Sequence, residues 1–208
     1  DLIYKKLLSE NNKLNLLLQL LASTADGILD LHTGPVATRY LYAAEYEEEI
    51  AYYLKFKHIL LIPNEFGGAM DEAAFMPWIH LMNAFKKLGR NLTPDIESFT
   101  LEFGSEETFD MSNAEKDVES ILNYLRYKGV ISQEAQKNDA SSCLLKNYKT
   151  IYAPQGGLVD YKLSPGERFK TGDTIAEFYH FKNLDPNDPI NSTKSEVIAD
   201  YDGIIINR

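Results

Sequence analysis

The amino-acid sequence predicts an α/β layered domain followed by a small all-β module. Over roughly residues 1–131, segments with apolar side chains at helical spacing alternate with short apolar runs that are typical of strands. From Ile151 onward the helical spacing disappears, and short alternating segments are separated by turns rich in glycine and proline. The stretch 132–150 is polar and is predicted to be a linker, so the β-module comprises residues 151–208.

Periodicity and breaker residues predict the elements of the α/β domain. Ser112 and Glu115 have the spacing of a capping box, and Gly129 stands where a C-terminal helix cap is expected. In chain order we expect a helix over Leu2–Ala22, a strand over Ile28–Leu31, a helix near Ala43–Phe56, a strand over His58–Ile62, a helix over Asp71–Leu88 with Pro77 inside it, a strand over Ser98–Phe103 and a helix between Ser112 and Gly129.

The composition excludes several classes of partner. A net charge of -10 argues against binding to nucleic acid or to an anionic membrane surface, but it leaves room for a locally basic site that binds a small anion. The longest apolar run, Leu14–Ala22, is interrupted by Asn15 and Gln19 and is too short to span a bilayer. No signal peptide is recognisable, and Cys143 is the single cysteine, so we expect a reducing, cytoplasmic location.

The segment Asp-Leu-His-Thr-Gly, residues 30–34, is the strongest local signal for chemistry. It places His32 at the end of a predicted buried strand, where α/β sheets carry ligand and metal groups. Asp30 lies two residues earlier on the same face of the strand, so it could orient the imidazole of a metal ligand. Taken alone, such a segment more often contains a structural histidine than a metal ligand.

The second signal is the strand Thr-Leu-Glu-Phe-Gly, residues 100–104. Glu102 is a carboxylate inside an otherwise apolar strand, where burial is costly unless the group has a partner or a task. Taken alone, the segment is better explained by an edge strand with Glu102 facing water.

The order of these segments resembles the succinylglutamate desuccinylase/aspartoacylase family, which is related to the zinc carboxypeptidases. The resemblance rests on DLHTG, then TLEFG, then NYLRYKG, and it extends through APQGGLV, GDTIA and VIADYDG in the tail. It covers nearly the whole chain, and the first two motifs are specific as an ordered pair. It implies a partial zinc carboxypeptidase-like domain, with a mixed sheet and flanking helices, followed by a small β-barrel-like module.

The resemblance also implies roles for single residues. His32 matches the last zinc ligand of the family and Glu102 its catalytic general base, so zinc is the expected cofactor. The first two ligands of the family, a His and a Glu spaced H-x-x-E, are missing before residue 30. The other histidines, His58, His80 and His180, all follow His32, so we expect two metal ligands to be absent from this chain.

The expected activity is zinc-dependent hydrolysis of the amide bond in an N-acyl amino acid or a related small anionic substrate. Arg90 is the candidate for binding a substrate carboxylate, since guanidinium groups match carboxylates in a bidentate way, with Arg39 and Arg126 as rivals. Two alternatives stay open. One is a metallocarboxypeptidase that acts on peptide C-termini, and the other is a catalytically incomplete fragment with a structural or binding role. The β-module is expected to shape the entrance of the site or to support assembly, and a homo-oligomer is compatible with the sequence.

Overall fold

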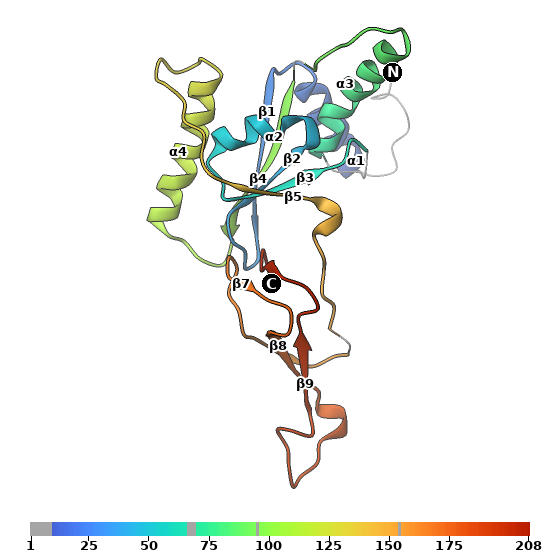
Figure 1. Ribbon diagram of the computed structural model, residues 1–208, viewed down its shortest axis with the longest axis vertical. Helices are drawn as coiled ribbons and strands as arrows, with labels where there is room; N and C mark the ends of the chain where they lie inside the picture. The colour runs from blue at the N-terminus through green and yellow to red at the C-terminus, as the bar shows by residue number, and fades with distance from the viewer. Residues whose placement is uncertain (1–9, 66–69, 95, 154) are drawn as a thin grey trace. The chain divides into compact units, whose positions relative to one another are not determined.

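The computed structural model describes residues 10–65, 70–94, 96–153 and 155–208, which form two compact units (Figure 1). The first unit consists of the described residues up to His32 together with Tyr40–Phe103 and Asp110–Tyr148. The second consists of Thr33–Arg39, Gly104–Phe109 and Lys149–Arg208. Strands β1 and β4 therefore begin in the first unit and end in the second.

A mixed five-stranded sheet forms the centre of the first unit, with the strand order β1-β4-β2-β3-β5. Strand β2 runs parallel to β3 and antiparallel to β4, and β3 runs parallel to β5. The strands are β1 (Gly27–Gly34), β2 (Tyr40–Ala44), β3 (His58–Ile62), β4 (Glu97–Ser105) and β5 (Ser141–Leu144). The predicted α/β class with a mixed sheet is confirmed.

The longer helices of the first unit are α1 (Glu10–Ala22), α3 (Met70–Lys87) and α4 (Met111–Tyr127). The predicted first helix is confirmed from Glu10 onward, and its start lies outside the described residues. Helix α3 contains Pro77, as predicted. None of the helices in the described part of the chain combines the length and the apolar character needed to cross a bilayer.

The two faces of the sheet carry separate cores, because successive side chains of a strand point to opposite faces. Leu41, Phe99 and Leu101 lie in one core together with Tyr124 of α4. Ala44 and Ile62 lie in another core with residues of α3, namely Phe75, Met76 and Ile79. Figure 1 shows α4 and α3 on opposite sides of the strands. The alternation places Thr100 and Glu102 on the face opposite to Phe99 and Leu101.

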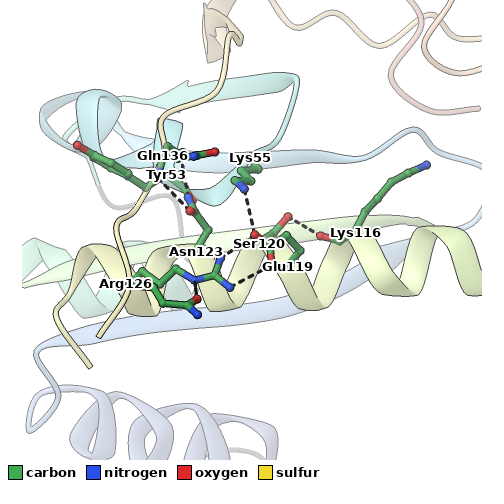
Figure 2. A network of polar contacts seen from close by, with 9 residues as sticks. Tyr53, Lys55, Lys116, Glu119, Ser120, Asn123, Arg126 and Gln136 are labelled. Atoms are coloured by element: carbon green, nitrogen blue, oxygen red, sulfur yellow. Dashed lines mark hydrogen bonds and ion pairs between the residues drawn. The ribbon is translucent and has the colours of Figure 1, made fainter. Parts of the chain in front are cut away.

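Polar contacts fix α4 to the chain around it (Figure 2). Asn123 is fully buried, and its Nδ2 donates to the carbonyl oxygens of Tyr53 at 2.6 Å and Gln136 at 2.8 Å. Its Oδ1 accepts from the amide of Gln136 at 3.0 Å. One turn earlier on the helix, Glu119 accepts from Lys55 at 3.0 Å and from Arg126 at 2.7 Å.

Three sequence-based expectations for the first unit need correction. The helix expected near Ala43–Phe56 is replaced by the end of β2 and by short helical turns, η1 (Glu45–Glu47), α2 (Glu48–Ala51) and η2 (Tyr52–Leu54). Residues 132–150 are not a free linker, since they contain β5 and its pairing with β3. The N-cap of α4 is Asp110 instead of Ser112, because the Asp110 carboxylate accepts from the Ser112 amide at 2.9 Å.

The second unit is all-β, as the sequence predicts. Its three-stranded antiparallel sheet contains β6 (Leu158–Tyr161), β8 (Thr174–Tyr179) and β9 (Lys194–Ile198), and β7 (Arg168–Phe169) pairs with β10 (Gly203–Ile204). Phe169, Ile175 and Ala199 form its small core. The segment 33–39 also belongs to it, since the amide of Thr38 donates to the carbonyl oxygen of Ile206 at 2.9 Å.

Candidate active site

Two neighbouring strands bring the sequence-predicted site residues together. Asp30 and His32 lie on β1 and Glu102 lies on β4, and these strands are adjacent in the sheet. Because Asp30 and His32 are two residues apart, their side chains point to the same face. Asp30 and His32 both influence the pKa of the Glu102 carboxyl, and the three side chains are called here the acid–imidazole group.

Asp30 orients the imidazole of His32. The Nε2 atom of His32 lies 3.1 Å from Oδ1 of Asp30. A carboxylate can only accept, so the hydrogen of this contact is on Nε2, and Nδ1 is the ring nitrogen that a metal could bind. This carboxylate–imidazole arrangement is typical of histidines that bind metals, because it fixes both the tautomer and the ring orientation. The His32 side chain is half exposed, at 50%, so the imidazole can be reached from outside.

Glu102 has the electrostatic setting of a base. Partial burial raises its pKa, the nearby His32 lowers it, the Asp30 charge raises it, and the net result is a pKa above the usual glutamate value. A carboxylate with a raised pKa holds an abstracted proton better near neutral pH. No hydrogen bond to the Glu102 carboxylate is found among the described residues, so its oxygens are available to a water or a substrate.

Two tyrosines lie on the same face as Glu102, and neither was proposed from the sequence. Tyr40 faces Glu102 directly across β2 and β4, and it is 3% exposed. Its ring lies 5.4 Å from that of Tyr42, edge to face. Burial, Tyr42 and the Glu102 charge together raise the pKa of Tyr40, so its hydroxyl stays protonated. The alternation Tyr-Leu-Tyr-Ala over residues 40–43 is the sequence signal that could have predicted strand β2.

Neither Arg90 nor Arg126 is seen to contact the acid–imidazole group among the described residues. Arg90 lies three residues after the end of α3, where its backbone amide donates to the carbonyl oxygen of Phe85 at 3.0 Å, and its side chain is exposed. No contact between Arg90 and the acid–imidazole group is found among the described residues, so its role as a substrate ligand stays a prediction. Arg126 binds Glu119 and Gln133 beside α4.

The donor set of the acid–imidazole group fits one position of a metal centre. His32 offers a second ring nitrogen, Nδ1, in an imidazole supported by a carboxylate, which suits zinc. Within the residues that the structure describes, no group of three or more His, Cys, Asp or Glu side chains could hold a metal ion. His180 is committed elsewhere, with Nε2 2.7 Å from Oγ of Ser195 in the second unit. Among the described residues, the group therefore offers one candidate metal ligand and not a complete set.

Comparison with solved structures reveals proteins that are similar to this chain over nearly its whole length. A Shewanella frigidimarina NCIMB 400 protein assigned as a succinylglutamate desuccinylase/aspartoacylase matches 99% of this chain at 34% identity, with a TM-score of 0.87. A Shewanella amazonensis SB2B protein assigned to the same family matches 96% at 37% identity, with a TM-score of 0.85. A succinylglutamate desuccinylase from Silicibacter sp. TM1040 shares the fold, at 17% identity and a TM-score of 0.63.

This chain spans about half the length of these solved relatives, 55% of the first and 54% of the second. Neither the comparison with models of protein families nor the comparison with curated proteins gave a match. The structural matches therefore define what the chain resembles, and they extend over nearly all of its residues.

Proposed function

The chain belongs to the succinylglutamate desuccinylase/aspartoacylase family, and from this membership we propose that it forms part of a zinc-dependent deacylase. The proposed reaction is hydrolysis of the amide bond in an N-acyl amino acid or a related small substrate. The family resemblance of the sequence is confirmed by the structural matches. The observation that carries the proposed activity is the half-buried Glu102 carboxylate beside the Asp30–His32 pair on the neighbouring strand.

Glu102 is proposed to move the proton of the reaction. Its carboxylate takes a proton from water while the water oxygen forms a bond to the amide carbon. The carbon–nitrogen bond then breaks, and the leaving amine takes that proton from Glu102. The raised pKa of Glu102 supports both steps, because the group must accept a proton and then release it near neutral pH.

His32 is proposed to be one ligand of the zinc ion, with Asp30 holding its imidazole in place. When bound, zinc lowers the pKa of water and polarises the carbonyl of the substrate. A catalytic zinc site commonly has three protein ligands, so two more are needed than this group offers. We propose that polypeptide beyond residues 1–208 supplies them, in keeping with the greater length of the solved relatives.

The proposed substrate is a small anion. The acid–imidazole group contains two carboxylates, so a positive side chain has to hold an anionic substrate, and Arg90 is the proposed residue. The single cysteine fits the proposed cytoplasmic location.

An activity panel tests the proposed function. The complete protein encoded by the gene should be purified, loaded with zinc and assayed on N-acyl amino acids and on short peptides, with and without a chelator. We expect chelator-sensitive release of free amino acid from the acylated substrates. Release of C-terminal residues from peptides alone would identify a carboxypeptidase, and no hydrolysis in either set by zinc-loaded protein would refute the proposed activity.

A further inference from the structure

The second unit contains a pocket of about 340 Å³, and every residue that lines it belongs to this unit. Its apolar lining includes Phe169, Ile175 and Ala199, the buried residues that form the core of the unit. Ligand sites commonly measure about 300–1,000 Å³, so a volume near the lower end of this range suits a small molecule. The pocket, called here the β-module pocket, therefore offers a small ligand an apolar surface to pack against.

Hydrogen bonds fix the chain on both sides of residues 200 and 201, which line the β-module pocket. Before them, the amide and the carbonyl of Ala199 each bond to the backbone of residues 172–173 at 2.8 Å. After them, Oδ1 of Asp202 accepts from the amide and the hydroxyl of Thr171, at 2.8 and 3.1 Å. A site that is held in place before binding loses less conformational entropy when a ligand enters.

Two side chains of opposite charge line the β-module pocket. The Lys149 ammonium lies 4.3 Å from the centroid of the Tyr201 ring, and this cation–π contact leaves its N–H groups open to a ligand. Asp200 also lines the pocket, and burial together with the Asp200 charge raises the pKa of Tyr201. Among the described residues, neither the Lys149 ammonium nor the Asp200 carboxylate makes a hydrogen bond or an ion pair. Both charges are therefore available to a ligand.

An apolar pocket that carries one cation and one carboxylate complements a zwitterion with an apolar body. We propose that the β-module pocket binds a free α-amino acid with an apolar side chain. The Lys149 ammonium binds its carboxylate, Asp200 binds its ammonium, and its side chain packs against the apolar lining. A simple carboxylic acid would meet repulsion from Asp200, and a simple amine would meet repulsion from Lys149. This site goes beyond the proposed function and does not depend on it, since none of its residues belongs to the acid–imidazole group.

A set of matched ligands tests the class of molecule on the unaltered protein. The complete protein encoded by the gene is labelled at its isoleucine methyl groups and titrated with L-phenylalanine, 3-phenylpropanoate, 2-phenylethylamine and L-alanine. Ile175 and Ile198 line the pocket, so their methyl signals should shift with L-phenylalanine, whereas that of Ile59 in the first unit should not. We expect L-phenylalanine to bind at least about fivefold more tightly than the other three, each of which lacks one charge or most of the apolar side chain.

Two variants test the assigned charges. Lys149→Met should weaken L-phenylalanine at least about fivefold and leave 2-phenylethylamine no weaker, because the amine has no carboxylate to lose. Asp200→Asn should weaken L-phenylalanine by a similar factor and leave 3-phenylpropanoate no weaker. Lys182→Met and Asp139→Asn, both at exposed positions, are the controls and should keep wild-type affinity.

Three results would overturn the inference. One is the absence of shifts at Ile175 and Ile198 with L-phenylalanine up to about 10 mM. Another is equal or tighter binding of 3-phenylpropanoate or 2-phenylethylamine to the wild type, which would identify a site for a simple acid or amine. The third is unchanged affinity for L-phenylalanine in both Lys149→Met and Asp200→Asn. The ligand series uses the wild type alone, so it decides the matter even where a variant fails to fold.

Discussion

The two ends of strand β4 place glutamates in opposite settings. At its start, the Glu97 carboxylate accepts from the Tyr124 hydroxyl at 2.6 Å and from Lys128 at 2.9 Å. Glu47 lies beside this end, fully buried, and accepts from the backbone amides of Ser98 at 2.8 Å and Ala44 at 3.2 Å. Every carboxylate oxygen of these two residues therefore has a donor.

At the other end, Glu102 has no hydrogen-bond donor among the described residues and instead lies near an imidazole and a second carboxylate. Buried polar groups are normally satisfied, because an unpaired one costs free energy. A carboxyl group whose oxygens all have partners is suited to hold the fold together, whereas one that is half buried with open oxygens is suited to bind and move a proton. On this comparison, the glutamates at the start of β4 hold the fold together, and Glu102 near its end is the residue proposed to move a proton.

Removal of the base should give the largest effect. Glu102→Gln keeps the size of the side chain but removes its basicity, so kcat of the zinc-loaded complete protein on an N-acyl amino acid should fall by about 10² to 10⁴. Glu106→Gln, in an exposed position after β4, is the control and should keep wild-type kcat. Near wild-type kcat for Glu102→Gln would show that both ends of β4 are structural.

At the start of β4, the expected effect is a pH dependence of the free energy of unfolding. Burial raises the pKa of Glu47 from 4.5 to about 8. Between these values the folded chain binds more protons than the unfolded chain, so the free energy of unfolding should fall as pH rises. The slope is at most about 1.4 kcal/mol per pH unit, or up to about 4 kcal/mol over the window.

Urea unfolding at pH 5, 6, 7 and 8 measures this slope. Glu47→Gln cannot titrate, so its free energy of unfolding should vary less with pH than that of the wild type, whatever its absolute stability. Glu45→Gln is the exposed control two residues away and should keep the wild-type slope. Identical slopes for Glu47→Gln and the wild type would mean that Glu47 is ionised throughout.

Loss of the Asn123 side chain should cost stability and leave the chemistry untouched. Asn123→Ala removes three hydrogen bonds and leaves the carbonyls of Tyr53 and Gln136 without their donor. We expect a loss of about 3 kcal/mol in the free energy of unfolding by urea. Asn113→Ala, exposed on the same helix, should change it by less than about 0.5 kcal/mol. A folded Asn123→Ala protein with strongly reduced kcat would place this network in the site as well.

Loss of the carboxylate behind the imidazole should have the smallest effect. Asp30→Asn removes the negative charge that orients His32, so zinc affinity of the complete protein should fall by about 10- to 100-fold. At saturating zinc, kcat should fall less than in Glu102→Gln. Asp26→Asn, exposed before β1, is the matched control. Unchanged zinc affinity in Asp30→Asn would show that the Asp30–His32 contact does not support a ligand.

The sequence predicted the parts of the fold in which one physical signal dominates. Apolar runs predicted β3 and β4, and helical periodicity predicted α1 from Glu10 onward and α3. Strand β2 was missed because the apolar residues of the following turns, such as Ile50 and Leu54, also fit a helical spacing. Strand β5 was missed because it is short and lies in a polar stretch, where tertiary pairing with β3 overrides local composition.

The site was predictable in part. His32 and Glu102 were proposed because the order of their two motifs resembles a known family. In the structure they lie on the neighbouring strands β1 and β4, together with Asp30. Tyr40 could not be assigned without the register that pairs it with Glu102. Glu47 lies within an acidic run that predicts a solvated surface, and only the folded chain shows its burial against Ser98.

The zinc content of two variants tests the central claim most directly. In the complete protein, Glu102→Gln should retain one zinc per chain although it is inactive, because Glu102 is assigned to proton transfer. His32→Ala should lose zinc and activity together, and His80→Ala, exposed on α3, should keep both. Elemental analysis paired with kcat decides the matter. Loss of zinc from Glu102→Gln, or full zinc in His32→Ala, would contradict the account and require the metal site to be redrawn.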